Sequence, residues 1–160
     1  MAANPEAAGE PEEEPQERVL VIERSFDAPR ALVFKAWSEP EHLVRWWVPA
    51  GYTLPSCELD CRPGGFFRCV MRSPEGNETR LQCEFREVSA PERLVFTWAW
   101  LDEDGTLKHE TLVTLNFEEQ GEKTKLTLHQ EVFESVSARD MHEGGWTGCL
   151  DSLGDYLASL

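Results

Sequence analysis

Apolar and polar residues alternate along most of the chain with the two-residue period of β-strands. The alternation begins with Leu20, Ile22 and Phe26, which predict a first strand over about residues 18–26. Turn residues separate six further stretches of this kind, at about residues 52–61, 65–73, 78–88, 93–101, 109–118 and 123–132. The connections between these strands are too short for parallel crossovers, so we expect a mainly antiparallel sheet.

Helical spacing of apolar residues appears directly after the first strand and again at the C-terminal end. Pro29 suits the first helical position, and Pro40 divides the segment into two short helices. From about residue 137 to 160, apolar residues recur at i, i+4, i+5 and i+8, which predicts one long amphipathic helix. Three glycines lower the helix propensity of this segment by about 1 kcal/mol each relative to alanine, so we expect close packing or a gap there: Gly144, Gly145 and Gly148.

This order of elements predicts an α+β fold, in which a curved antiparallel sheet of about seven strands wraps around the C-terminal helix. The two short helices after the first strand would close one end. Large rings recur on one face of the strands, and rings on opposite walls of a curved sheet need not meet. The interior is therefore either a solid core or an apolar cavity with a few polar groups. The residues that we expect to line such a cavity and bind a ligand are Trp37, Trp46, Trp47, Phe67, Met71, Phe85, Trp98, Trp100, His109, Met141, Trp146 and Leu150.

Trp46 and Trp47 are adjacent in the second short helix, where neighbouring side chains point about 100° apart. We therefore expect that they cannot both face inward. One of them belongs to the core, and the other either shapes an entrance to the cavity or covers that end of the core.

His109 is the histidine that we expect at the rim of the cavity, because it shares strand parity with Val113 and Leu115. His129 has the opposite parity and is expected on the surface, and His142 lies near the start of the last helix. The strand start that carries His109 should be open to water, which would leave a reaction there poorly shielded. We therefore predict no catalytic residue.

The sequence carries none of the established catalytic signatures: G-x-S-x-G, H-E-x-x-H, a P-loop or a dinucleotide-binding G-x-G-x-x-G. Cys57 and Cys61 would lie on one strand face roughly 13 Å apart, which is too far for one zinc ion. We expect neither a metal nor a cofactor, and we expect reduced thiols at the five cysteines.

Acidic residues outnumber basic ones by 30 to 15, which gives a formal net charge of −15. This charge repels nucleic-acid phosphates and anionic lipid headgroups, so we expect no nucleic-acid and no membrane partner. Residues 1–17 contain six glutamates and no basic residue, and we expect them to form a disordered acidic tail ahead of one domain at residues 18–160. The chain shows no signal-peptide pattern, and we expect the protein in the cytoplasm.

Several short motifs occur in order from about residue 18 to 160. They are Ser-Phe-Asp-Ala-Pro at 25–29, Val-Phe-Lys-Ala-Trp at 33–37, Pro-Glu-His-Leu at 40–43, Arg-Trp-Trp at 45–47, Arg-Pro-Gly-Gly-Phe at 62–66, Pro-Glu-Arg-Leu-Val-Phe-Thr-Trp at 91–98, Gly-Gly-Trp at 144–146 and Leu-Asp-Ser-Leu at 150–153. Together they resemble the activator of heat-shock-protein-90 ATPase homologue-like family, which belongs to the START-like or SRPBCC superfamily of Bet v 1-like proteins.

The resemblance implies a helix-grip fold with a hydrophobic cavity between the sheet and the C-terminal helix. It does not imply one activity, because similar proteins include cochaperone domains and ligand-sequestering proteins, and more distant ones are cyclases and hydrolases. Our leading hypothesis is non-enzymatic binding of a small hydrophobic or aromatic molecule. The first alternative is an interaction module that activates a chaperone ATPase. The second is an enzyme of the cyclase or hydrolase type that uses His109 or a cavity carboxylate as its acid–base group.

Overall fold

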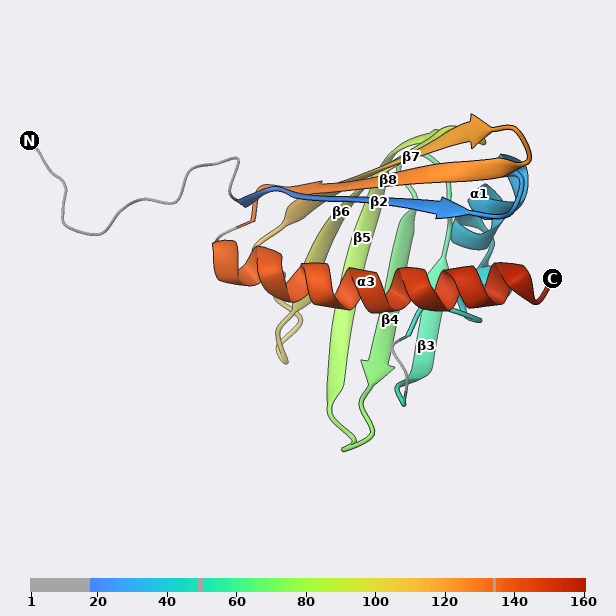
Figure 1. Ribbon diagram of the computed structural model, residues 1–160. Helices are drawn as coiled ribbons and strands as arrows, with labels where there is room; N and C mark the ends of the chain where they lie inside the picture. The colour runs from blue at the N-terminus through green and yellow to red at the C-terminus, as the bar shows by residue number, and fades with distance from the viewer. Residues whose placement is uncertain (1–17, 49–50, 134) are drawn as a thin grey trace, which may run out of the picture.

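In residues 18–48, 51–133 and 135–160, which the computed structural model describes, a seven-stranded antiparallel sheet curves around one long helix (Figure 1). The elements in chain order are β2 (Leu20–Phe26), α1 (Arg30–Ser38), α2 (Pro40–Leu43), β3 (Thr53–Leu59), β4 (Phe66–Arg72), β5 (Glu78–Ser89), β6 (Arg93–Leu101), β7 (Thr111–Gln120), β8 (Lys123–Glu131) and α3 (Val136–Ala158). The predicted α+β helix-grip fold is confirmed, and the predicted strands and long helix begin and end within two residues of the observed ones. The predicted acidic tail, residues 1–17, lies outside the described residues.

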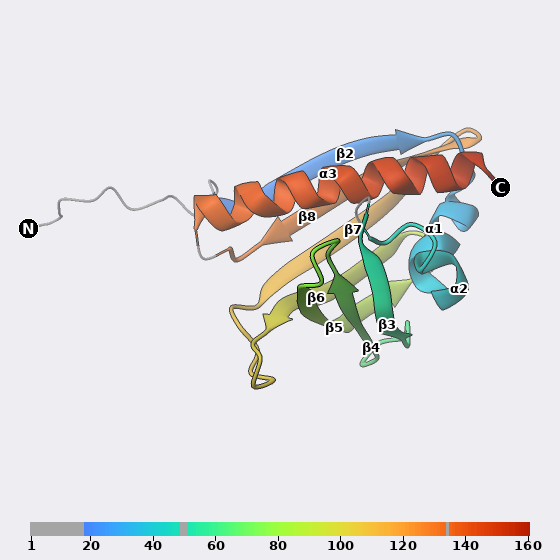
Figure 2. The same ribbon diagram turned by 90° about the horizontal axis from the view of Figure 1, so that it is seen from below.

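The strands lie in the order β2-β8-β7-β6-β5-β4-β3, so β3 to β8 form consecutive hairpins. β2 adds to the edge of β8, with Leu20 opposite Gln130 and Phe26 opposite Thr124. Register shifts interrupt the β3–β4 and β5–β6 pairings, and such irregularities increase the local bend of a sheet. As a result α3 runs alongside β2 and β8 and crosses β3, β4 and β5 at a steep angle (Figures 1 and 2).

The two adjacent tryptophans after α2 are both buried, with only 2% of Trp46 and 3% of Trp47 exposed. The expectation that only one could face inward is wrong. α2 ends at Leu43, and both residues lie in the helical turn that follows it. Both are buried because this turn is packed on more than one side: Trp46 contacts Trp37 of α1, and Trp47 contacts Phe67 of β4 and Trp146 of α3. The indole N–H of Trp46 donates to the carbonyl of Ala36 at 3.0 Å, which fixes that ring against α1.

A buried chain of hydrogen bonds ties α3 to the sheet. The indole N–H of Trp146 donates to Oε1 of Gln130 at 2.8 Å, and Nε2 of Gln130 donates to Oγ1 of Thr111 at 2.7 Å. The Thr111 hydroxyl in turn donates to the carbonyl of Trp98 at 3.2 Å. Because buried polar groups that lack partners are costly, this chain fixes the position of α3 relative to β6, β7 and β8.

The described helices include none with the length and apolar content needed to cross a membrane.

Candidate functional site

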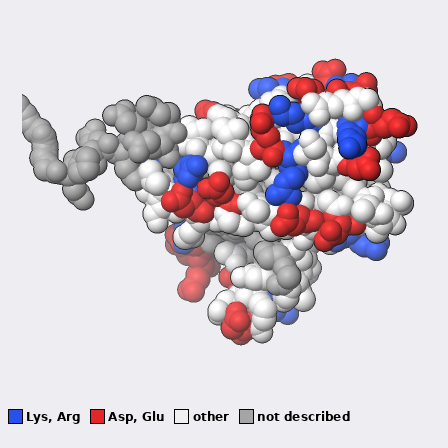
Figure 3. All heavy atoms as spheres, viewed as in Figure 1, with Lys and Arg blue, Asp and Glu red and all other residues white. Residues whose placement is uncertain are grey.

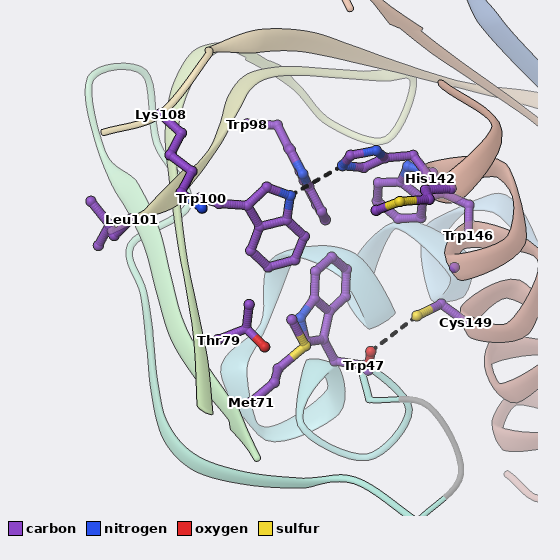
Figure 4. A pocket seen from close by; sticks show the side chains of 12 residues that line it. Trp47, Met71, Thr79, Trp98, Trp100, Leu101, Lys108, His142, Trp146 and Cys149 are labelled. Carbon is purple, nitrogen blue, oxygen red and sulfur yellow. Dashed lines mark hydrogen bonds between the residues drawn. The ribbon is translucent and has the colours of Figure 1, made fainter. Parts of the chain in front are cut away.

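A cavity of about 390 Å³ lies between the N-terminal half of α3 and the ends of β4, β5 and β6 (Figure 4). Its lining is mostly aromatic and aliphatic, with few polar groups. The lining residues are Trp47, Met71, Thr79, Trp98, Trp100, Leu101, Lys108, Met141, His142, Gly145, Trp146 and Cys149.

The exposure of the lining residues shows which end of the cavity is open. Trp47, Trp98 and Trp146 are buried and form the inner wall. Four lining residues are exposed and surround the mouth: Thr79, Lys108, Met141 and Gly145. At Met141, 74% of the residue is accessible to solvent. The sheet, the turn after α2 and the first half of α3 therefore all contribute to one chamber that opens to water.

Four indoles form the walls of the chamber and contact one another. The ring centroids of Trp98 and Trp146 are 4.9 Å apart. The ring centroid of Trp47 lies 5.9 Å from that of Trp98 and 5.7 Å from that of Trp146. Trp100 meets Trp98 edge to face at 5.6 Å. Large rigid rings that support one another in this way hold a cavity open, because none of them can collapse into it without losing its own contacts.

Gly145 leaves a gap in the wall that α3 contributes. A Cβ atom added there would meet no atom within 4 Å apart from its chain neighbours and the backbone of its own helix, and the same is true of Gly144 and Gly148. Of the two alternatives expected for these glycines, the structure shows open space instead of close packing. Gly145 is the member of this set that lines the cavity.

His142 joins α3 to β6 at the cavity and is the histidine that lines it (Figure 4). Its Nε2 accepts the indole N–H of Trp100 at 3.2 Å, and its Nδ1 lies 2.8 Å from the carbonyl of Ala138. Since an indole nitrogen can only donate, Nε2 carries no proton and Nδ1 donates to the carbonyl. Burial lowers the pKa of His142, and the hydrogen bond to Ala138 opposes this shift in part. The ring is therefore neutral near pH 7.

The structure places His109 outside the cavity, which corrects the expectation from strand parity. β7 begins only at Thr111, so His109 belongs to the preceding loop, is exposed and bonds to the carbonyl of Val132 through Nε2. Sequence reasoning missed His142, although its spacing from Trp146 and Cys149, at i, i+4 and i+7, is typical of one helix face.

The other predicted ligand-binding residues fall into three groups. The first group lines the cavity and consists of Trp47, Met71, Trp98, Trp100, Met141 and Trp146. Trp37, Phe67 and Phe85 line a second cavity of about 20 Å³ instead. Trp46 and Leu150 are buried but line neither cavity. Besides His142, sequence reasoning missed Thr79, Leu101, Lys108, Gly145 and Cys149, which come from strand ends, a loop and α3.

The titratable groups at the cavity are held in bonds to the protein. Cys149 donates its thiol to the carbonyl of Trp47 at 3.1 Å, and burial raises its pKa to about 12, so the thiol stays protonated. Lys108 pairs with Asp102 at 3.3 Å at the mouth. Away from the cavity, Asp151 of α3 pairs with Arg24 of β2 at 2.7 Å. Figure 3 shows acidic and basic side chains interspersed on the face drawn there. Among the residues that the structure describes, no group of three His, Cys, Asp or Glu side chains could hold a metal ion.

Residues 27–158 match the family model described as Activator of Hsp90 ATPase homolog 1-like protein. The chain belongs to this family. The family resemblance found in the sequence is thereby confirmed.

Solved structures of bacterial proteins have the same fold. The AHSA1 protein from Silicibacter pomeroyi is 30% identical, with a TM-score of 0.81, and the match covers 88% of this chain and 97% of that one. A protein from Nitrosomonas europaea is 28% identical, with a TM-score of 0.75 and coverage of 89% and 96%. A Rhodobacter sphaeroides protein is 27% identical, with a TM-score of 0.76 and coverage of 90% and 94%. No curated protein matches the chain.

Proposed function

We propose that this protein binds a small hydrophobic or aromatic molecule in the cavity between the sheet and α3, and does not change it chemically. The observation that carries the proposal is the chamber of about 390 Å³ that has four tryptophans in its walls and opens to solvent beside Met141. Ligand sites of small molecules are typically apolar cavities of roughly 300–1,000 Å³. Burial of apolar ligand surface, at roughly 25 cal/mol per Å², would supply most of the affinity.

The polar groups of the cavity favour binding over catalysis. Both ring nitrogens of His142 are engaged, the Cys149 thiol is protonated and donates to a carbonyl, and Lys108 is paired with Asp102. A general acid or base must be free to exchange a proton with the substrate. These groups instead hold the walls of the chamber in place.

A neutral fluorescent probe, N-phenyl-1-naphthylamine, tests the proposal in titrations and in thermal unfolding. We expect saturable binding and a higher melting temperature, because a ligand that binds only the folded state stabilises it. Gly145→Leu should weaken probe binding at least tenfold by filling the chamber. Gly144→Leu is the matched control, because its position is equally open but does not line the cavity, and it should bind as the wild type does. An absence of saturable binding to the wild type, or equal losses in the two variants, would contradict the proposal.

Replacing the wall tryptophans gives an independent test of the same proposal. Trp98→Ala and Trp146→Ala should weaken probe binding more than any surface substitution. The Trp146 variant also loses the bond to Gln130, so its fold must be checked by circular dichroism before affinities are compared.

A second candidate function rests on the description of the matching family, which names activation of the Hsp90 ATPase. We propose it as the alternative: an interaction module that stimulates a chaperone ATPase through surface contacts. Purified Hsp90 ATPase, measured with and without this protein, tests it. Stimulation by the wild type that persists in Gly145→Leu would favour surface contacts over cavity binding.

We also propose that the protein acts in the cytoplasm. All five cysteines are free thiols, and Cys83 is fully enclosed by the core, which suits a reducing compartment.

A further inference from the structure

Trp47 lines both the cavity of about 390 Å³, called the main cavity from here on, and the smaller second cavity. Among the described residues, it is the one that lines both. The second cavity, of about 20 Å³, lies toward the two short helices. Its remaining lining residues are Trp37, Leu43, Leu59, Phe67, Phe85, Leu94 and Phe96. The indole of Trp47 thus separates two apolar spaces inside one core.

Contacts on both sides hold this indole in place. Its ring meets Phe67 of the second cavity edge to face at 5.0 Å, and Trp146 of the main cavity at 5.7 Å. The Trp47 carbonyl accepts the Cys149 thiol at 3.1 Å, which anchors the turn after α2 to α3. Only 3% of Trp47 is exposed, so the residue belongs to the inner wall of the chamber and is not a flap at its mouth.

We propose that Trp47 determines which ligands fit, by closing the chamber at its inner end. This inference rests on the proposed function. The class of ligand that fits is a compact molecule, aromatic or alicyclic, that fills the space between Trp47 and the mouth at Met141. A long straight alkyl chain extending inward would meet the Trp47 ring before it could reach the space beyond. Removing the indole would join the two cavities and admit such a chain.

A series of N-alkyl-1-naphthylamines, from ethyl to decyl, tests this proposal by isothermal titration calorimetry. Each buried methylene strengthens binding about fourfold, so affinity should rise along the series until the chain meets a wall. For the wild type we expect this rise to stop at a short chain. In Trp47→Ala it should continue for at least two further methylenes. Trp47→Leu provides a second variant that keeps more of the apolar packing, in case the alanine variant does not fold.

Trp46→Leu is the matched control, because Trp46 is the neighbouring residue and equally buried but lines neither cavity. It also loses a buried indole, and its rise should stop at the same chain length as in the wild type. A limit that is the same in wild type and both Trp47 variants would overturn the role of Trp47 and leave ligand binding intact. If the wild type binds no member of the series and does not bind N-phenyl-1-naphthylamine, the proposed function itself is overturned.

Discussion

Trp100 donates its indole N–H to Nε2 of His142 at 3.2 Å, and this bond connects the end of β6 to the first turns of α3 at the cavity. The partner nitrogen must be unprotonated to accept, and the other ring nitrogen donates to the carbonyl of Ala138. Protonation of His142 would place two donors face to face and break the bond. The cavity wall therefore depends on a neutral histidine.

Acidification should lower the stability of the protein through His142. Burial lowers the pKa of this histidine below its ordinary value of 6.5, so below that pH the unfolded chain binds more protons than the folded protein. The contribution of His142 is fully present above about pH 6.5 and is lost as the pH falls through the folded pKa. Free energies of unfolding between pH 8 and pH 5 measure it. His142→Gln keeps an acceptor for Trp100 but does not titrate, and should lose less stability on acidification; equal losses would contradict the prediction.

Gln130→Leu should destabilise the protein by about 1–3 kcal/mol, because it leaves the buried indole N–H of Trp146 without its acceptor and removes the bond to Thr111. Urea unfolding measures the loss. In the background of Trp146→Phe, which has no N–H to satisfy, the same substitution should cost less. Additive losses in this double-mutant cycle would show that the two side chains do not depend on each other.

Gly65→Ala should destabilise the turn before β4 by more than about 1 kcal/mol. An added Cβ would lie 2.1 Å from the carbonyl oxygen of Asp60. That oxygen cannot easily move, because it accepts the backbone N–H groups of Arg62 and Phe66. Gly144→Ala is the contrasting control: its Cβ would meet nothing, and it should raise stability by up to about 1 kcal/mol through helix propensity. Chemical denaturation of both variants tests the pair, and a neutral effect of Gly65→Ala would count against the close approach.

Deleting residues 1–17 should change the free energy of unfolding by less than about 0.5 kcal/mol, as is usual for changes outside the packed structure. The reason is their composition, with six glutamates, three prolines and no large apolar residue beyond Met1. Paired thermal and urea unfolding of the full and shortened chains measures the difference. A larger loss would mean that the tail packs against the domain.

The sequence alone determined the elements, the faces of the strands and the family. Period-two alternation placed Phe67, Phe85 and Trp98 on the inner faces of their strands, and all three are buried. The prediction succeeds because each strand or helix is buried on one side and faces water on the other. Its apolar and polar residues therefore follow the period of that element. The same periodicity made the long C-terminal helix recognisable despite its glycines.

Only the tertiary structure decided what the interior contains. Strand parity put His109 near the cavity, but β7 begins later and the helix brings His142 there instead. Helical spacing allowed only one of Trp46 and Trp47 inside, but the turn after α2 buries both and sets Trp47 between two cavities. Periodicity reports which way a side chain faces within its own element. It does not report how far apart two walls stand, because that distance depends on the bend of the sheet and on where α3 crosses it.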